Sequence, residues 1–310
     1  MLQVTLKQLR TFATVARSRT LAAAAEALGI TPPAVTIQLK LLEDGIGLPL
    51  IERGAGGHKL TAAGEEVLAA AQHVDHALGQ CEAALQQMQG LERGSVTLGV
   101  VGPAQYFAPA AIAAFAVVHP KIDVRLAIGN RAWMVAALER LAVDVAIMGR
   151  PPDTLEAESH LVGDNPHVIV APPGHPLSQR RVQLVTAAKE PYLVREQGSG
   201  TRALMEHRWA EAGLKIRIAM EIASTETIKQ AVIAGLGLAF LSAHTVASEV
   251  ESGRLVILDV AGLPVMRQWF LVRNAERRLL PAAETFRAFL EVQLPRLLPT
   301  APTASALPPG

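Results

Sequence analysis

The chain has 310 residues, of which 50% are apolar and 18% are charged, so it is too long for one ordinary core and too apolar for a disordered protein. Its longest apolar run, residues 107–118, is too short for a membrane-spanning helix. Basic residues interrupt the N-terminus, where a secretory signal would need an apolar stretch. We therefore expect a cytoplasmic protein. The single cysteine excludes an intramolecular disulfide and a thiolate metal cluster. The net charge is +1, but the charges are unevenly distributed: residues 1–60 are basic, whereas residues 61–92 contain acidic residues and no Lys or Arg. This distribution indicates a separate N-terminal module that binds an anion.

Three helices and a β-hairpin are predicted in residues 1–60. Apolar spacing predicts a helix over residues 5–18, a second over 21–28 that ends at Gly29, and a third that begins at Thr31 and Pro32. Two short strands, 50–53 and 58–60, flank a glycine-rich tip. This pattern is typical of a winged helix-turn-helix, although periodicity alone leaves open an αα-hairpin in an unrelated core. The basic charge, the wing and the N-terminal position favour DNA binding.

The third helix carries the expected DNA contacts, because its Val35, Leu39 and Leu42 face the core and leave the opposite side free. We expect Thr31 to Lys40 to enter the major groove. The residues predicted near base edges or thymine methyls are Pro32, Pro33, Ala34 and Thr36. Those predicted chiefly at phosphates are Gln38, Lys40 and Arg53, and the predicted interface also includes Arg10 and Thr31.

A long helix is predicted from residue 61 to about 90, within a linker of residues 61–92. Apolar residues repeat along it in steps of four and three, which is a heptad pattern typical of helix pairing. The residues predicted to join two subunits are Val67, Val74, Leu78, Cys81 and Leu85. A surface helix lying on its own domain is the alternative.

Beyond residue 93, strand and helix patterns alternate, which predicts an α/β domain with mostly parallel sheets. The expected strands are 96–101, 123–128, 143–148, 168–171, 192–194, 216–222, 238–241 and 270–273. The expected helices are 104–118, 132–141, 201–212, 225–234, 243–252 and 281–294. Residues 297–310 are rich in Pro, Ala and Thr and are expected to be a disordered tail.

One motif in this domain resembles a cofactor site. The run from Gly198 to Ala203 fits the glycine-rich dinucleotide fingerprint, follows a strand and opens a helix. That fingerprint normally opens its domain at the first strand, so the more general interpretation is an anion at a helix N-terminus, and a simple turn remains an alternative. Asp144 could be a catalytic carboxylate, but its position at the start of a buried strand favours a structural role. We therefore predict no catalytic residues, no metal ligands and no resident cofactor.

The chain resembles the LysR-type transcriptional regulators over nearly its whole length, up to about Leu294. The N-terminal stretches that carry the resemblance are Leu9 to Phe12, Ala22 to Leu28, Thr31 to Thr36, Leu42-Glu43, Leu50 to Arg53 and Leu60 to Gly64. Two departures are Ile37, where many members have arginine, and a wing tip without extra basic residues. Both reduce the phosphate contacts that we expect.

The second half is similar to a narrower group, the regulators of carbon-dioxide-fixation (Calvin cycle and Rubisco) operons. The stretches that carry this similarity are 106–109, 130–131, 146–152, 193–196, 198–202, 226–232 and 239–245. The resemblance implies an effector-binding domain over residues 93–296, with two α/β lobes like those of periplasmic binding proteins. Lobe I would comprise residues 95–161 and 267–296, and lobe II residues 162–266.

The same resemblance implies an effector site between the lobes. The residues expected there are Gly102, Pro103, Asn130, Met148, Gly149, Gly198, Ser199, Thr201, Arg202, Ser224 and Thr225. Helix N-termini and Arg202 suit a small phosphorylated or carboxylated metabolite, and phosphorylated sugars, phosphoenolpyruvate and NADPH are the candidates. The expected partners are double-stranded operator DNA, a second copy of the chain in a dimer or tetramer, and RNA polymerase.

Three alternative functions compete with a carbon-fixation regulator. A LysR-type regulator of another operon would share the same signatures. A nicotinamide-dependent enzyme would need neither the heptad pattern nor the basic N-terminus. A solute-binding transport protein would need export.

Overall fold

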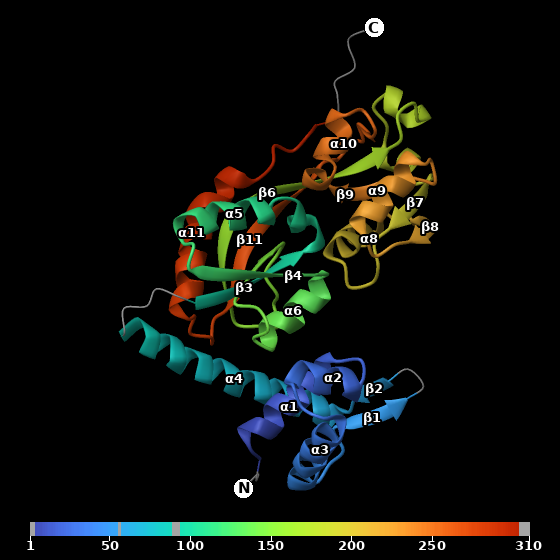
Figure 1. Cartoon of the computed structure of the whole chain (residues 1–310). Coiled ribbons are helices and arrows are strands. Elements are labelled where there is room, and N and C mark those ends of the chain that lie inside the picture. Colours follow the sequence, from blue (N-terminus) through green and yellow to red (C-terminus); the bar gives the residue numbers. More distant parts are fainter. Residues whose placement is uncertain (1–3, 55–56, 89–93, 304–310) are drawn as a thin grey trace. The chain divides into compact units, whose positions relative to one another are not determined.

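The computed structural model describes residues 4–54, 57–88 and 94–303, and the chain divides into two compact units, residues 1–89 and 90–310 (Figure 1). The N-terminal unit contains α1 (Leu6–Arg17), α2 (Leu21–Leu28), α3 (Pro32–Ile46), β1 (Ile51–Gly54), β2 (Gly57–Leu60) and α4 (Ala62–Met88). Threonine side chains cap the first three helices, because the hydroxyls of Thr5, Thr20 and Thr31 accept from backbone N–H groups of the first turns. Gly29 ends α2 with a φ of 64°, a left-handed conformation that favours glycine. The predicted helix-turn-helix and wing are confirmed.

The linker helix begins inside the core of the N-terminal unit. Leu68 and Ala71 of α4 are buried with Phe12, Leu42 and Leu50. The start of α4 passes so close to the wing that a Cβ at residue 64 would lie 2.1 Å from a backbone oxygen, so only glycine fits there. The first turns of α4 therefore belong to the winged-helix core, and do not form an independent linker.

The C-terminal unit alternates strands and helices, as expected. Its strands are β3 (Gly94–Val101), β4 (Ile122–Gly129), β5 (Val145–Met148), β6 (Ala157–Ala171), β7 (Pro191–Val194), β8 (Arg217–Glu221), β9 (Ala239–Ser242), β10 (Val256–Ile257) and β11 (Val265–Asn274). Its α-helices are α5 (Ala108–Val118), α6 (Arg131–Glu139), α7 (Leu184–Ala187), α8 (Gly200–Glu211), α9 (Thr225–Ile233), α10 (Ala247–Glu251) and α11 (Pro281–Leu297). Short 3-10 helices η1 (Gly102–Tyr106), η2 (Pro176–Gln179) and η3 (Ala243–Thr245) complete it, so the helices expected over 104–118 and 243–252 each begin with a separate 3-10 turn.

The expectation of mostly parallel sheets is wrong. Within the described residues 94–303, a seven-stranded mixed sheet runs in the order β10-β6-β11-β5-β3-β4, with β9 also paired to β6. Only β4, β3 and β5 are parallel in it, whereas β6 and β11 pair antiparallel over almost their whole lengths. The physical reason is that β6 carries the chain out of the first half of the unit and β11 brings it back. The expected strand 168–171 is only the end of β6, because residues 157–165 are mostly polar and give no apolar signal.

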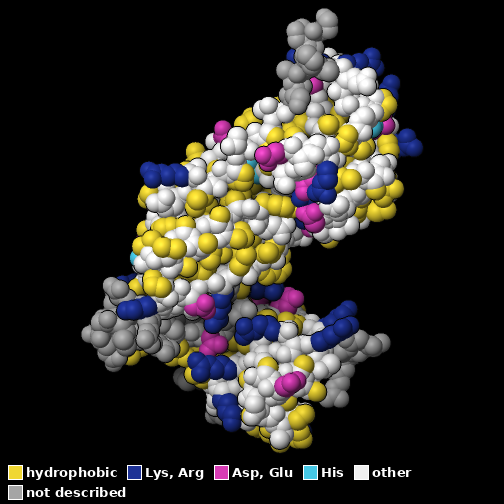
Figure 2. All heavy atoms as spheres, turned by 45° about the horizontal axis from the view of Figure 1, so that its top comes forward, with side chains coloured by type: hydrophobic (Ala, Val, Ile, Leu, Met, Phe, Trp, Pro, Cys, Tyr) yellow, Lys and Arg dark blue, Asp and Glu magenta, His cyan; other side chains and the backbone are white. Residues whose placement is uncertain are grey.

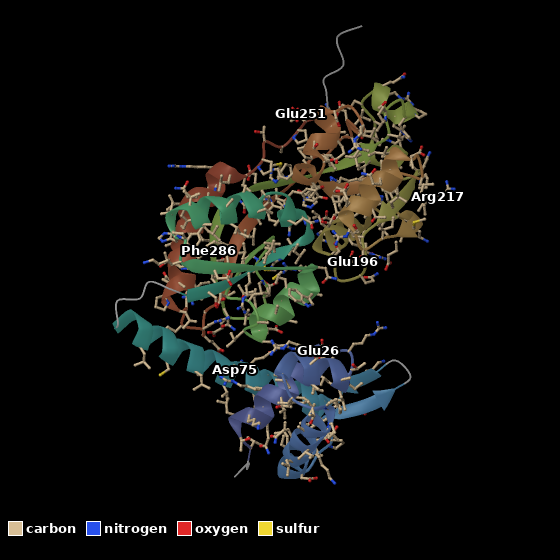
Figure 3. All side chains as sticks on the ribbon, viewed as in Figure 1. Glu26, Asp75, Glu196, Arg217, Glu251 and Phe286 are labelled. Carbon is tan, nitrogen blue, oxygen red and sulfur yellow. The ribbon has the colours of Figure 1, made fainter. Side chains whose placement is uncertain are left out.

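The apolar side chains of this unit form three clusters that lie in two lobes, as the resemblance implies. In lobe I, β3 and β5 pack against α5, α6 and α11, with Phe115 and Phe286 in the core (Figure 3). In lobe II, two further clusters include Trp209 and Phe240, and Ile228 and Leu241, respectively. The strands β6 and β11 cross between the lobes, and a small parallel sheet of β7 and β8 completes lobe II.

Two details of lobe I bear on the predictions. Asp144 is buried and accepts from the Arg277 guanidinium at 2.5 Å and from the Thr97 N–H at 2.6 Å, which confirms a structural role. The boundary of the expected tail is wrong, because Leu297 ends α11 and Leu298 packs on the lobe I core. Residues 304–310 lie outside the described residues.

Candidate functional site

The exposed side of α3 is the candidate DNA-binding surface. Val35, Leu39 and Leu42 are buried, so α3 presents its other side to solvent. On that side, Thr31, Pro32, Pro33, Thr36 and Lys40 are exposed, and Ala34 and Gln38 are partly buried. Figure 2 shows Lys and Arg side chains at several places on the viewed face of the N-terminal unit.

The wing is fixed to the helices by side-chain hydrogen bonds. Glu43 of α3 accepts from the backbone N–H of Leu50 at 2.8 Å. His58 of β2 donates through Nε2 to the carbonyl of Val15 at 2.8 Å, since a carbonyl can only accept. The side chain of Arg53 lies outside the described residues.

Arg10 is engaged within the N-terminal unit. Its Nε donates to Oδ1 of Asp75 on α4 at 2.7 Å, and both side chains are partly solvent-exposed (Figure 3). The structure therefore places Arg10 in an α1–α4 contact.

The predicted dimerisation residues differ in burial along α4. Val67 packs against the winged-helix core, whereas Val74, Leu78 and Leu85 are 39%, 41% and 54% exposed. Cys81 is also exposed. The C-terminal part of the heptad pattern is therefore an apolar surface on this chain.

The C-terminal unit contains a cavity of about 400 Å³ whose walls come from both lobes. Lobe I contributes Gly102 and Pro103 of η1, Asn130 and Arg131 at the start of α6, and Gly149, Arg150 and Asp153 after β5. Lobe II contributes Arg195, the α8 residues Gly200, Thr201, Ala203, Leu204 and His207, and Ser199, which precedes that helix. The cavity thus contains several hydrogen-bond donors and the N-terminus of a helix, which suits an anion.

The crossing strands also contribute side chains to this cavity. Arg267 of β11 lies opposite Asn165 of β6, and Trp269 and His167 lie two residues further along their own strands. Because residues two apart on a strand share a face, all four side chains line the cavity. Four arginines, Arg131, Arg150, Arg195 and Arg267, therefore surround it.

Arg195 connects the cavity wall to lobe II. Its guanidinium is 6% exposed, donates twice to Glu196 at 2.8 and 3.0 Å, and donates to the Thr225 hydroxyl at 2.8 Å. Glu196 in turn accepts from Asn130 of lobe I at 3.3 Å (Figure 3). Burial acts to raise the pKa of Glu196, but the hydrogen bonds and charge of Arg195 prevail and lower it. Glu196 is therefore ionised at neutral pH and links Arg195 to the opposite lobe.

The structure brings six of the eleven predicted effector residues to the cavity: Gly102, Pro103, Asn130, Gly149, Ser199 and Thr201. Met148, Gly198, Arg202, Ser224 and Thr225 do not line it. The guanidinium of Arg202 instead donates to Glu206 at 2.8 Å, to the backbone oxygen of Arg195 at 3.0 Å, and to Glu221. Arg202 follows Thr201 on α8, so its side chain points in a direction about 100° from that of Thr201. It lines an adjoining hollow that shares Ser199 and Ala203 with this cavity.

Sequence reasoning missed Arg131, Arg150, Arg195, Arg267, Asn165, His167, His207 and Trp269. The crossing strands gave no clear alternation, because the first part of β6 is mostly polar and Arg267 of β11 is followed by Gln268. Arg131, Arg150 and Arg195 lie on loops or at element ends, where no periodicity marks the direction of a side chain.

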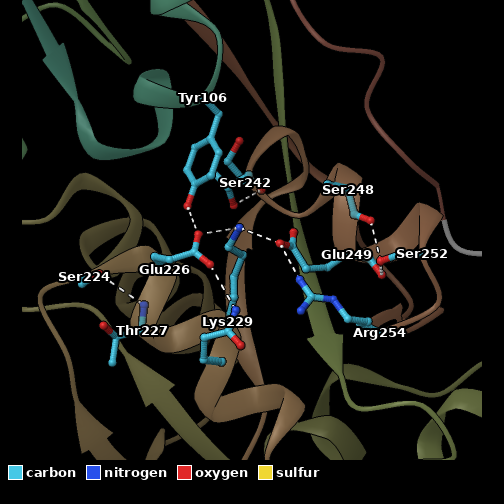
Figure 4. A network of polar contacts seen from close by, with 12 residues as sticks. Tyr106, Ser224, Glu226, Thr227, Lys229, Ser242, Ser248, Glu249, Ser252 and Arg254 are labelled. Atoms are coloured by element: carbon cyan, nitrogen blue, oxygen red, sulfur yellow. Dashed lines mark hydrogen bonds and ion pairs between the residues drawn. The ribbon is translucent and has the colours of Figure 1, made fainter.

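A second group of polar side chains joins the two lobes beside the cavity (Figure 4). Lys229 of α9 is 3% exposed and donates to Glu226 at 2.8 Å and to Glu249 at 3.0 Å. Tyr106, which ends η1 in lobe I, donates its hydroxyl to Glu226 at 3.1 Å, and its ring centre lies 4.6 Å from the Lys229 ammonium. Burial acts to lower the pKa of Lys229, but these carboxylates raise it, so the ammonium stays charged. We call Tyr106, Glu226, Lys229 and Glu249 the interlobe cluster.

Among the described residues, no group of His, Cys, Asp and Glu side chains is arranged to hold a metal ion. No helix in the described part of the chain is long and apolar enough to cross a membrane.

Comparisons with known proteins cover both units. Residues 6–65 match the family model for the bacterial regulatory helix-turn-helix protein of the LysR family, and residues 89–294 match the model for the LysR substrate binding domain. The HTH-type transcriptional regulator CbbR of Xanthobacter flavus is 53% identical over 301 residues, which cover 96% of this chain and 90% of that protein. A RuBisCO operon transcriptional regulator of Allochromatium vinosum is 42% identical over 96% of this chain and 98% of its own length.

Solved structures agree with these matches. The regulatory domain of CcmR from Synechocystis PCC6803, in complex with 2-PG, aligns with a TM-score of 0.62 and 30% identity, over 64% of this chain and 96% of that one. A full-length OxyR variant from Pseudomonas aeruginosa aligns over 99% of both chains with a TM-score of 0.68, and at 22% identity it supports the fold alone.

Proposed function

Because the chain belongs to the LysR family of transcriptional regulators, we propose that it is a sequence-specific DNA-binding regulator of a carbon-dioxide-fixation operon, gated by a small anionic metabolite. The observation that supports control by an anionic metabolite is the cavity lined by four arginines from both lobes. A ligand that contacts both lobes stabilises one lobe arrangement by its differential affinity, which is typically worth about 1–3 kcal/mol. DNA binding implies a cytoplasmic location, and RNA polymerase is the expected partner for activation.

The choice of operon rests on relatives whose names refer to CbbR or to the RuBisCO operon and whose identities to this chain reach 53%. The test is to sequence the genomic fragments that the purified protein retains. We expect fragments from upstream of Rubisco genes. Enrichment of a different promoter would instead favour the alternative, a LysR-type regulator of another metabolic operon.

The proposed DNA interface consists of the exposed side of α3 and the wing. Replacing Arg53 with alanine is expected to weaken binding to all sequences about equally and to reduce the slope of log affinity against log salt by about one, because one phosphate contact is lost. Fluorescence anisotropy with operator and unrelated duplexes between low and moderate salt measures both quantities.

The matched control for Arg53 is Arg217→Ala, which removes an exposed arginine from β8 in the other unit. This variant should keep the wild-type slope. An unchanged slope for Arg53→Ala would remove Arg53 from the interface.

The proposed effector is a phosphorylated or carboxylated metabolite, with phosphorylated sugars, phosphoenolpyruvate, NADPH and 2-phosphoglycolate as candidates. The last is included because the CcmR regulatory domain is in complex with 2-PG and is 30% identical to this chain. Arg195→Ala is expected to weaken anion binding by roughly 10- to 100-fold, because a hydrogen bond to a charged group contributes about 1.5–3 kcal/mol. Calorimetry of the full chain with these metabolites measures the change.

The structure supplies a control on the same helix as the predicted site. Arg202→Ala removes a guanidinium that lies outside the cavity, so it should retain most of the affinity, whereas Thr201→Val changes a cavity residue and should weaken binding. Equal affinities for wild type, Arg195→Ala and Thr201→Val would place the site elsewhere. Binding of a neutral aromatic ligand in place of any anion would contradict the anionic effector.

A further inference from the structure

His167 is a buried histidine that lines the cavity from the floor formed by the crossing strands. It is 5% exposed, and its ring stacks on Phe240 with centroids 5.5 Å apart. Its Nδ1 lies 3.1 Å from the backbone oxygen of Asn165. A carbonyl oxygen can only accept, so Nδ1 carries a proton and the tautomer is fixed.

The surroundings of His167 keep its ring neutral. Burial lowers its pKa to about 4. The hydrogen bond to the Asn165 carbonyl acts to raise the pKa but does not offset burial, and the electrostatic effects of Arg267 and His244 act in the same direction as burial. A neutral ring with its proton on Nδ1 has a lone pair on Nε2. This nitrogen is therefore a hydrogen-bond acceptor at neutral pH.

Several acceptors of this cavity are already engaged. The side-chain oxygen of Asn165 accepts from the Ser242 hydroxyl at 2.7 Å, and that of Asn130 accepts from the Trp133 N–H at 2.9 Å. The Asp153 carboxylate is paired with Arg150 at 2.9 Å. Among the described residues, Nε2 of His167 makes no hydrogen bond, so this nitrogen is an acceptor available to a ligand. The charged side chains around it in the cavity include four arginines and the carboxylate of Asp153.

We propose that His167 is a specificity-determining residue that accepts a hydrogen bond from a hydroxyl group of the effector, so that the site selects hydroxylated anions over anions without a hydroxyl. The arginines bind the phosphate or carboxylate, and His167 recognises the hydroxyl. An anion without a hydroxyl makes no hydrogen bond with Nε2, so its affinity is lower. This inference rests on the proposed anionic effector and narrows its candidates to those with a hydroxyl group, which phosphoenolpyruvate and 2-phosphoglycolate lack.

The test is titration calorimetry of the full chain with two matched ligands, 3-phosphoglycerate and 3-phosphopropionate, which differ only in the 2-hydroxyl group. We expect the wild type to prefer 3-phosphoglycerate by about tenfold. His167→Phe keeps an aromatic ring beside Phe240 but has no acceptor, and it should bind both ligands about equally. His167→Gln, which restores an acceptor oxygen, should recover part of the preference.

A second measurement tests whether His167 takes up a proton when the ligand binds, and compares the wild type with His167→Phe. Titration in two buffers of different ionisation enthalpy reports the protons taken up on binding. We expect no proton uptake by His167, so the difference in binding heat between the two buffers should be the same for the wild type and for His167→Phe. Uptake of one proton that is absent in His167→Phe would show that His167 becomes charged and donates, which would overturn the proposal.

The outcomes separate this inference from the proposed function. If both ligands bind the wild type with equal affinity, the role of His167 is wrong while the anionic effector stands. If His167→Phe keeps the full preference, the hydroxyl is recognised by another residue. If neither ligand nor 2-phosphoglycolate binds, the anionic effector and the role of His167 are both wrong.

Discussion

Replacing Leu78 with glutamate is expected to produce monomers that bind operator DNA at least 100-fold more weakly than the wild type. Leu78 lies on α4 with Val74 and Leu85, and all three apolar side chains are substantially exposed on the single chain. A charge in a paired heptad position would have to be buried without a partner, which opposes association. In a dimer the two DNA-binding units are linked, and this linkage raises operator affinity by about 10²- to 10⁴-fold. Monomers bind the two half-sites independently and lose this gain.

The measurements for Leu78 are sedimentation velocity at micromolar concentration and operator binding by anisotropy. The matched control is His73→Glu, which introduces the same charge on α4 at an exposed position outside the apolar pattern. This control should remain dimeric. A dimer of Leu78→Glu at micromolar concentration would contradict pairing through α4.

Replacing Lys229 with methionine is expected to destabilise the C-terminal unit by about 3 kcal/mol and to lower its melting temperature by roughly 6–12 °C. The ammonium lies between Glu226 and Glu249, and the Glu249 side chain is only 7% exposed. Without Lys229, Glu249 keeps the half-exposed Arg254 at 3.3 Å as its remaining cationic partner, so a buried carboxylate is left poorly compensated. Thermal unfolding followed by circular dichroism measures the loss.

A double variant distinguishes the unpaired charge from lost packing. Lys229→Met with Glu249→Leu removes both members of the buried pair, and it should recover much of the stability, because two apolar side chains leave no buried charge. Equal melting temperatures for the single and double variants would indicate that packing of the lysine side chain is the larger effect. Tyr106→Phe removes one hydroxyl and retains the ring over Lys229, so its effect should be small.

The sequence alone determined the organisation of the N-terminal unit. Helix caps, the left-handed Gly29 and the periodic burial of Val35, Leu39 and Leu42 are local features, and local features can be read from neighbouring residues. The exposed side of α3 follows from the same periodicity. Several separate stretches of the sequence resemble the family, and this resemblance predicted the two lobes of the C-terminal unit.

The direction of individual side chains in the effector site was decided by the tertiary structure. Arg202 was predicted to contact the effector, but its guanidinium is held by Glu206, Glu221 and the backbone of Arg195. Arg195, which directly follows β7, lines the cavity instead. A one-residue difference on a helix turns a side chain by about 100°, so a motif locates the loop without fixing which residue enters the cavity.

Length, charge asymmetry and periodic burial were sufficient to determine a DNA-binding module, a heptad-patterned helix and an α/β domain. Antiparallel pairing of β6 with β11 could not be read from the chain, because its partners are about a hundred residues apart and the first part of β6 is polar. That pairing brings Asn165 and His167 beside Arg267 and Trp269 in one cavity wall. Sequence patterns record which face of an element is buried, whereas only the folded chain decides which distant polar groups share a cavity and so what that cavity can bind.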